Sequence, residues 1–422
     1  MRLVFRIVLV TAILLLLLPT ISLSKTKIIF WHMYDSGPGK EVMDEIIGRF
    51  NANNTLGIEV EALAISFWDY WDKLGVAMAA GQEPDIFMHD LGNVPSRAYK
   101  GVLADLTPYI KAKGIVPEKS FFTVPLNMCK WEDKFYALPF ETDVRLLYWN
   151  KDLFKQAGLD PDKPPSTWQE LWEYASKIDK KSPQGTYDVL GFNPIYGQSY
   201  FWMYVWGTGG TFLDNKGNIS VNNPTVVKAL EEWIGMLNKL GIKELEQFNA
   251  TYGWGADAFL AGKLGMVIQV GQYAAIIKIF APNLNYGVTH IPYPVKATWS
   301  NGFSLEVSSR SKNKDAAAEF ALYLVSKEVQ LMMAQRLNSL VCNIEAAKDP
   351  SLMQNPEWRL QVEALEYSQF RPFVLEAPVW YEELQKAVDE VRLGRKPAKK
   401  ALDDAQKLIE SEIQKFRLTN KK

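Results

Sequence analysis

The sequence predicts an α/β protein of two lobes, each built on a doubly wound sheet that carries helices on its faces. The chain has 422 residues, which is more than one compact core usually holds. Short β-rich runs alternate with helical spacing over the first hundred residues, as in sheets of parallel strands joined by crossover helices. A hydrophobic fraction of 48% supplies enough apolar material for packed cores.

The N-terminus has the pattern of a secretory signal. Two arginines precede an apolar run over residues 7–18, which Pro19 ends, and small residues follow up to Ser24. The run is shorter than the roughly 18 apolar residues that a membrane span requires. We therefore expect residues 1–24 to be a cleaved signal peptide and, because no Cys lies near that point, we expect no lipid anchor.

The first lobe is expected to begin with a strand-helix-strand order. Strands are predicted over 27–31, 58–64 and 84–88, with a helix around 70–80. A Gly- and Pro-containing turn after the first strand leads into helical spacing of five apolar residues: Val42, Met43, Ile46, Ile47 and Phe50.

Ligands of such sheets lie beyond the carboxyl ends of the strands. The loops after Trp31, Ala64 and Met88 should therefore border a binding site. These loops are rich in His, Tyr, Trp and Asp.

The second lobe is expected to begin near a strand at 145–149. Thr167 and Glu170 form a capping-box pattern at the start of a helix. The apolar face of this helix consists of Trp168, Leu171, Trp172, Ala175 and Ile178. Further helices are predicted over 225–240, 314–326, 361–367, 381–393 and 401–416.

Composition and motifs exclude several classes of function. Lys and Arg number 47 against 48 Asp and Glu, so no bulk field would attract nucleic acid or an anionic membrane. Three histidines lie far apart, and neither a metal-site spacing nor a nucleotide-binding loop is present, so we expect no metal and no cofactor. Cys129 and Cys342 are expected to be two buried thiols, although their pairing depends on the fold.

The aromatic residues point to a sugar. The chain has 14 Trp and 18 Tyr, several of them in loops where packing periodicity does not explain them. Aromatic faces can cover the C–H faces of a sugar ring, while carboxylates and amides hydrogen bond its hydroxyls. A secreted glycosidase is a remote alternative, because that chemistry needs only two carboxylates about 5–10 Å apart and leaves no short motif.

Several stretches resemble the extracellular solute-binding proteins of carbohydrate ABC importers (family 1, maltose-binding-protein-like). The matching stretches are KIIFWH and residues 79–110, 135–171, 259–273 and 311–326. The resemblance implies the two-lobe periplasmic-binding-protein fold, with a hinge and a ligand cleft between the lobes. It places the N-terminal lobe at 25–141 plus 306–347, the C-terminal lobe at 146–299 plus 350–422, and hinge crossings at 141–145 and 300–305.

The same resemblance implies site residues. The motif PDIFMHD places a ligand-binding acid at Asp90 with His89 beside it, and LPFETDVRLLYWNK places a second acid at Asp143. Tyr273 and Trp380 match family aromatics that stack on sugar. The remaining ligand-binding candidates follow from loop position: His32, Tyr34, Trp68, Trp202, Trp206, Asn301 and Gly302.

The implied function is capture of a mono- or oligosaccharide outside the cytoplasmic membrane and delivery to an ABC transporter permease. We expect a monomer without catalytic residues. A glycerol-3-phosphate or glycerophosphodiester binder of the same fold is the alternative, because FWHMYDSGPGK resembles the first loop of that branch. Maltose-binding relatives carry Glu-Pro-Tyr where this chain has Gly197-Gln198-Ser199, which argues against a maltodextrin ligand.

Overall fold

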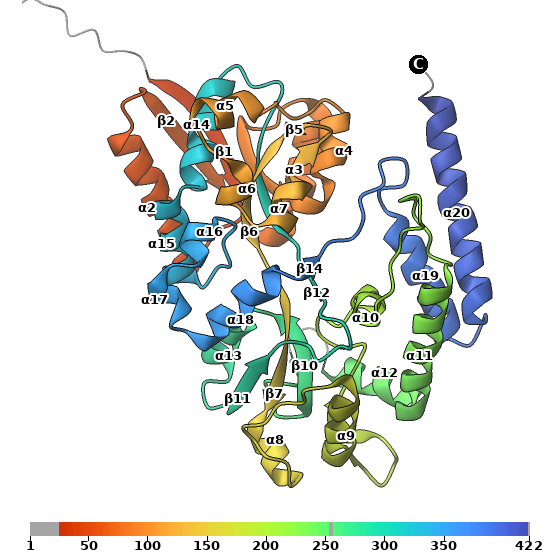
Figure 1. Ribbon diagram of the computed structural model, residues 1–422. Coiled ribbons are helices and arrows are strands. Elements are labelled where there is room, and N and C mark those ends of the chain that lie inside the picture. Colours follow the sequence, from red (N-terminus) through yellow and green to blue (C-terminus); the bar gives the residue numbers. More distant parts are fainter. Residues whose placement is uncertain (1–24, 253–255, 421–422) are drawn as a thin grey trace, which may run out of the picture.

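The computed structural model describes residues 25–252 and 256–420, in which two five-stranded sheets form two lobes (Figure 1). The first lobe contains the sheet ordered β2 (Ile58–Ala64), β1 (Thr26–His32), β3 (Ile86–Asp90), β13 (Gly302–Val307) and β6 (Ala137–Thr142). The second contains the sheet ordered β11 (Tyr286–Thr289), β7 (Arg145–Asn150), β10 (Leu264–Val270), β9 (Tyr187–Phe192) and β8 (Lys180–Lys181). The expected signal peptide lies outside the described residues.

Both sheets are mixed, whereas the alternation of elements predicted parallel strands. In the first sheet β1 is parallel to β2 and β3, but β13 is antiparallel to β3 and β6. In the second, β10 is parallel to β9 and antiparallel to β7. The reason is topological: β6 runs out of the first lobe and β13 returns to it, so these neighbours point in opposite directions.

Helices cover the first sheet. Helix α2 (Gly37–Asn53) buries all five residues whose spacing predicted it, which confirms that prediction. The remaining short elements of this lobe are η1 (Leu91–Asn93), β4 (Lys130–Trp131) and β5 (Lys134–Phe135). Its other helices are α3 (Phe67–Ala80), α4 (Val94–Tyr99), α5 (Thr107–Ala112), α6 (Pro117–Ser120), α7 (Thr123–Met128), α14 (Lys314–Leu324), α15 (Lys327–Leu337) and α16 (Ile344–Ala347).

The second lobe is larger in helix content. In α9 (Trp168–Ile178) the Thr167 side chain accepts a hydrogen bond from the Glu170 backbone, as the capping box predicts, while Glu170 accepts from Ser166 rather than from Thr167. The other helices are α8 (Lys151–Gln156), α10 (Phe201–Gly207), α11 (Pro224–Leu240), α12 (Ile242–Thr251), α13 (Tyr273–Phe280), α17 (Pro350–Met353), α18 (Pro356–Leu365), α19 (Trp380–Arg392) and α20 (Ala398–Thr419).

Two further observations bear on the environment of the chain. Cys129 and Cys342 are both buried and unpaired, and burial raises the pKa of each thiol well above its usual value. Across the part of the chain that the structure describes, no helix combines the length and apolar character needed to cross a membrane.

Candidate functional site

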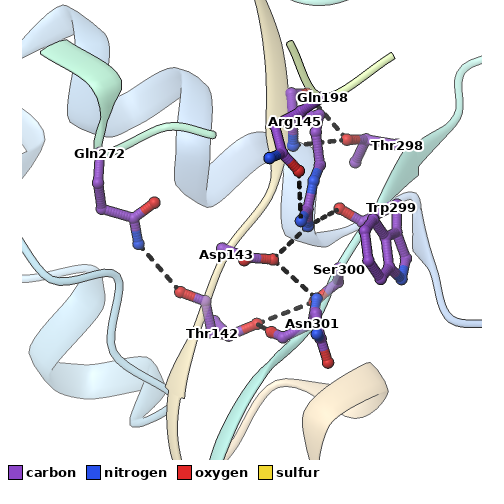
Figure 2. Close-up of polar contacts among 9 residues, drawn as sticks. All are labelled: Thr142, Asp143, Arg145, Gln198, Gln272, Thr298, Trp299, Ser300 and Asn301. Carbon is purple, nitrogen blue, oxygen red and sulfur yellow. Dashed lines mark hydrogen bonds and ion pairs between the residues drawn. The ribbon is translucent and has the colours of Figure 1, made fainter. Parts of the chain in front are cut away.

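The two sheets are joined by crossings that hydrogen bond to each other. Strand β6 passes into β7 through Asp143 and Val144, and β12 (Thr298–Trp299) passes into β13 through Ser300 and Asn301. The Thr142 hydroxyl lies 2.9 Å from the Ser300 hydroxyl, and the Asp143 carboxylate accepts a hydrogen bond from the Asn301 backbone N–H (Figure 2). The two crossings therefore form one hydrogen-bonded unit, against which β14 (Ser368–Gln369) pairs in parallel with β12.

Arg145 organises the second-lobe end of this unit. Its guanidinium donates to the Asp143 carboxylate at 2.5 Å, to the Trp299 carbonyl at 3.1 Å and to the Gln198 side chain at 3.3 Å (Figure 2). The Cζ atom lies 3.9 Å from the centroid of the Trp299 ring. Since Arg145 is only 4% exposed, Asp143 supplies the compensating charge that such burial requires.

An aromatic wall lies beside Arg145. The rings of Tyr200 and Trp202 stack with centroids 4.4 Å apart and planes 7° apart, and Trp299 meets both edge-on at 5.0 and 5.3 Å. Trp202 and Trp299 are buried at 7% exposure each. This arrangement offers flat apolar faces next to charged donors.

Arg371 stands against this wall from the segment between β14 and α19. Its Cζ atom lies 3.6 Å from the ring centroid of Tyr381, 5.1 Å from that of Trp202 and 5.2 Å from that of Trp299. Burial lowers the pKa of Arg371, while the nearby Tyr381 and Asp90 oppose that shift. Within the described residues, Nε of Arg371 and Nε1 of both tryptophans are buried without a hydrogen-bond partner.

Two adjoining pockets share Arg371 and Tyr381. The larger, of about 550 Å³, is lined on the second lobe by Tyr200, Trp202 and the start of α19. The smaller, of about 20 Å³, brings Asp90 and its neighbours of the first lobe against residues 370–373. We call these two pockets together the ligand cleft.

The first-lobe wall is fixed by a buried ion pair. Arg97 donates from Nε to Glu306 at 2.7 Å and from Nη2 to the Asp90 carbonyl at 2.7 Å, which fixes the end of β3. Burial raises the pKa of the Asp90 carboxyl, against the opposing effects of Arg97 and a hydrogen bond with Asn301. Burial also holds the pKa of His89 well below its usual value, so that imidazole is neutral.

Some predicted residues come together at the cleft. Asp90 lines it, and Asn301 links Asp90 to Asp143 by hydrogen bonds to both. Trp202 forms its aromatic wall, and Gly302 begins β13 directly after Asn301.

Other predicted residues lie elsewhere. His32 ends β1 and Tyr34 lies beside it just after the strand, and burial lowers the pKa of His32 to about 4. Trp68 is 66% exposed on α3. Three more are enclosed in the second-lobe core, at exposures of 4%, 2% and 1%: Trp206, Tyr273 and Trp380. The structure does not bring Tyr273 and Trp380 to the surface of a hollow shared with Asp90, and the ligand-binding roles of all these residues stay predictions.

Sequence reasoning did not select Arg371, Tyr381, Tyr200 or Trp299. Tyr381 follows Trp380 in the motif that was recognised, but α19 begins there, so consecutive side chains point in different directions. The Trp380 ring packs on Phe212 and its N–H donates to the Pro372 carbonyl at 2.8 Å, while Tyr381 faces Arg371. The only sequence signal for Arg371 is weak: it lies between aromatic and proline residues in the segment Phe370-Arg371-Pro372-Phe373.

Two α/β lobes joined by paired crossings, with a cleft lined from both, define a two-lobe solute-binding protein. The chain belongs to the family of bacterial extracellular solute-binding proteins, whose pattern matches residues 45–359. The exact residues at which each lobe was expected to begin and end stay a prediction.

Relatives by sequence and by structure are binding proteins. A protein of Brucella abortus named as a binding protein is 27% identical over 379 residues, covering 88% of each chain. The sn-glycerol-3-phosphate-binding periplasmic protein of Escherichia coli is 28% identical over 287 residues, covering 64% of this chain and 62% of its own.

Solved structures extend the likeness. A protein solved with mannotriose bound matches with a TM-score of 0.77 at 25% identity, covering 92% of this chain and all of its own. An ABC transporter solute-binding protein of Thermotoga lettingae, bound with α-D-tagatose, matches with a TM-score of 0.74 at 25% identity and the same coverage.

Proposed function

We propose that the protein binds a mono- or oligosaccharide in the ligand cleft and delivers it to the permease of an ABC importer. The observation that carries this proposal is the stacked Tyr200–Trp202 pair, set beside Trp299 and Arg371 in a pocket of about 550 Å³. Flat apolar faces beside buried, unpartnered N–H donors suit a ring with hydroxyls around its edge. Closure of the lobes on a ligand that contacts both would stabilise the closed form.

Thermal melts against a sugar panel test the proposal. Mannotriose and α-D-tagatose, the ligands of similar solved structures, come first. A bound sugar stabilises the fold by about 2.7 kcal/mol at a concentration of 100 Kd, and the effect grows with concentration. A flat response across mono- and oligosaccharides would count against sugar binding, and mass spectrometry of solute released on denaturation would then identify the ligand.

The second candidate is sn-glycerol 3-phosphate or a glycerophosphodiester. Arg371 favours it, because this half-buried guanidinium has no carboxylate within ion-pair distance in the described chain. Titration with the phosphorylated ligand and with neutral glycerol separates the two candidates. If the phosphorylated ligand produces a response that Arg371→Gln abolishes, and saccharides produce none, the ligand is a phosphate ester.

We also propose that this activity is binding without turnover, since the relatives named above are binding proteins. Hydrolysis of the best-binding saccharide, lost in Asp143→Asn, would instead indicate a glycosidase. Outside the cell, we expect a monomer released by cleavage after residue 24, without a lipid anchor. The N-terminal sequence of the exported protein tests that cleavage.

A further inference from the structure

The C-terminal helix extends beyond the core of its own lobe. The buried residues of α20 end at Ile409, yet the helix continues to Thr419. Figure 1 shows α20 running beside the second lobe until its end is level with the first lobe. An exposed, isolated helical extension has little stability of its own, so its contacts with other elements matter.

That extension contacts the first lobe through aromatic rings. The Phe416 ring lies 5.7 Å from Tyr99 at the end of α4, and Tyr99 in turn lies 6.1 Å from Trp131 on β4. Phe373, from the segment that carries Arg371, lies 6.2 Å from Trp131. Four rings thus form a continuous row, with two from each lobe.

The two second-lobe rings belong to one connected arm. Arg417 pairs with Glu376 at 3.1 Å, which ties the end of α20 to the segment after Phe373. The Trp380 N–H fixes the same segment to the second-lobe core through the Pro372 carbonyl. Movement of the second lobe therefore carries both rings with it.

The contact is small and partly exposed, which suits a contact that opens and closes. Tyr99 remains 42% exposed, and a groove of about 410 Å³ separates α4 from the arm next to the ring contact. Phe373 also lines the smaller pocket with Asp90. In Figure 1, α4 and α20 lie on one side of the molecule and α15 to α18 on the other, with β6 and β7 between them.

We propose that Tyr99 and Trp131 of the first lobe, with Phe373 and Phe416 of the second, form an aromatic latch that stabilises the arrangement of the lobes in which these rings meet, here called closed. Only one consequence of the latch rests on the proposed function, namely that a bound saccharide is lost more slowly. Its effect on closure is a property of the protein alone.

The test measures the distance between lobes without added sugar. Probes at Lys119→Cys and Lys216→Cys, both exposed and one on each lobe, report that distance by double electron–electron resonance. The full mature chain is first unfolded and refolded to remove retained solute. Phe416→Ala and Tyr99→Ala should each lower the ratio of closed to open molecules about three- to tenfold, as loss of an aromatic pair predicts.

Leu418→Ala is the matched control, because Leu418 lies on the same helix end and is 69% exposed. It should leave the distribution unchanged, and Tyr99→Phe, which keeps the ring, should do the same. Circular dichroism melts verify that each variant is folded. If Phe416→Ala and Tyr99→Ala give the distribution of Leu418→Ala, the latch does not exist, whatever the sugar panel shows.

Discussion

Asn301 and Asp143 hold the two crossings together by reciprocal hydrogen bonds. The Asn301 N–H donates to Asp143 Oδ1 at 2.8 Å, and the Asp143 N–H donates to the Asn301 carbonyl at 3.1 Å. The same Asp143 oxygen accepts from Arg145. One carboxylate therefore joins the two crossings and also balances a buried cation. When the lobes close, we expect them to rotate about this hydrogen-bonded unit without breaking it.

Asp143→Asn should destabilise the fold. The amide can still accept from Asn301, but Arg145, at 4% exposure, loses its only close carboxylate in the described chain. Because the Asp143 side chain is 22% exposed, we expect a loss of about 1–3 kcal/mol in the free energy of unfolding, below the figure for a fully buried pair. Urea denaturation measures it. Asp162→Asn, which removes the exposed partner of Lys151, should change stability by less than about 0.5 kcal/mol.

Gly302, the first residue of β13, has no room for a side chain next to the crossings. Its φ of +147° and a distance of 2.0 Å from an added Cβ to the Glu141 carbonyl oxygen leave no room. We expect Gly302→Ala to cost about 2–4 kcal/mol in the free energy of unfolding. Gly75→Ala, where an added Cβ meets nothing within 4 Å inside α3, should instead stabilise by about 0.5–1 kcal/mol. Equal effects of the two variants would contradict this account.

Local patterns predicted much of the fold because they report burial. The apolar spacing of α2 and the strand at Ile58–Ala64 were both readable from neighbouring residues alone. The antiparallel entry of β13 was not, since its pairing with β3 joins residues more than two hundred positions apart. Sequence spacing carries no signal for such a contact.

The site was predicted in part for the same reason. Asp90 ends β3 and Asn301 directly precedes β13, and these strand ends meet at the cleft. Arg371 lies in an irregular segment, where no periodicity indicates which way a side chain points. The choice of Trp380 over Tyr381 depended on where α19 begins, which sequence patterns fix only to within a turn.

Trp202 and Trp206 lie one helical turn apart on α10 and should separate affinity from stability. Trp202 faces the cleft, whereas Trp206 packs against Phe212. Trp202→Ala should weaken saccharide binding roughly tenfold or more, because a stacking face and an N–H donor are both lost. Fluorescence titration with a saccharide that stabilises the wild-type protein measures the Kd. Trp206→Ala should lower the melting temperature with a smaller change in Kd. If Trp206→Ala weakens binding more than Trp202→Ala does, the saccharide binds elsewhere.

Glu141 should make stability fall as pH rises. Burial raises the pKa of this carboxyl to about 7, with Asp143 adding to the shift and the neighbouring Tyr34 hydroxyl opposing it. A carboxyl whose folded pKa exceeds its unfolded value binds its proton more tightly in the native state. Its contribution is therefore complete below about pH 4.5 and is lost as pH rises through 7.

Glu141→Gln tests that sign, because its amide oxygen can still accept from Ser339, which donates to Glu141 in the structure. We expect the variant to match the wild-type protein near pH 4.5 and to exceed it by about 1–3 kcal/mol in the free energy of unfolding at pH 8. Glu170→Gln is the control of opposite sign, since hydrogen bonds from Ser166 lower the pKa of that exposed carboxyl. A difference between Glu141→Gln and wild type that does not change from pH 4.5 to pH 8 would show that Glu141 is ionised throughout, so that burial near the crossings does not hold its proton.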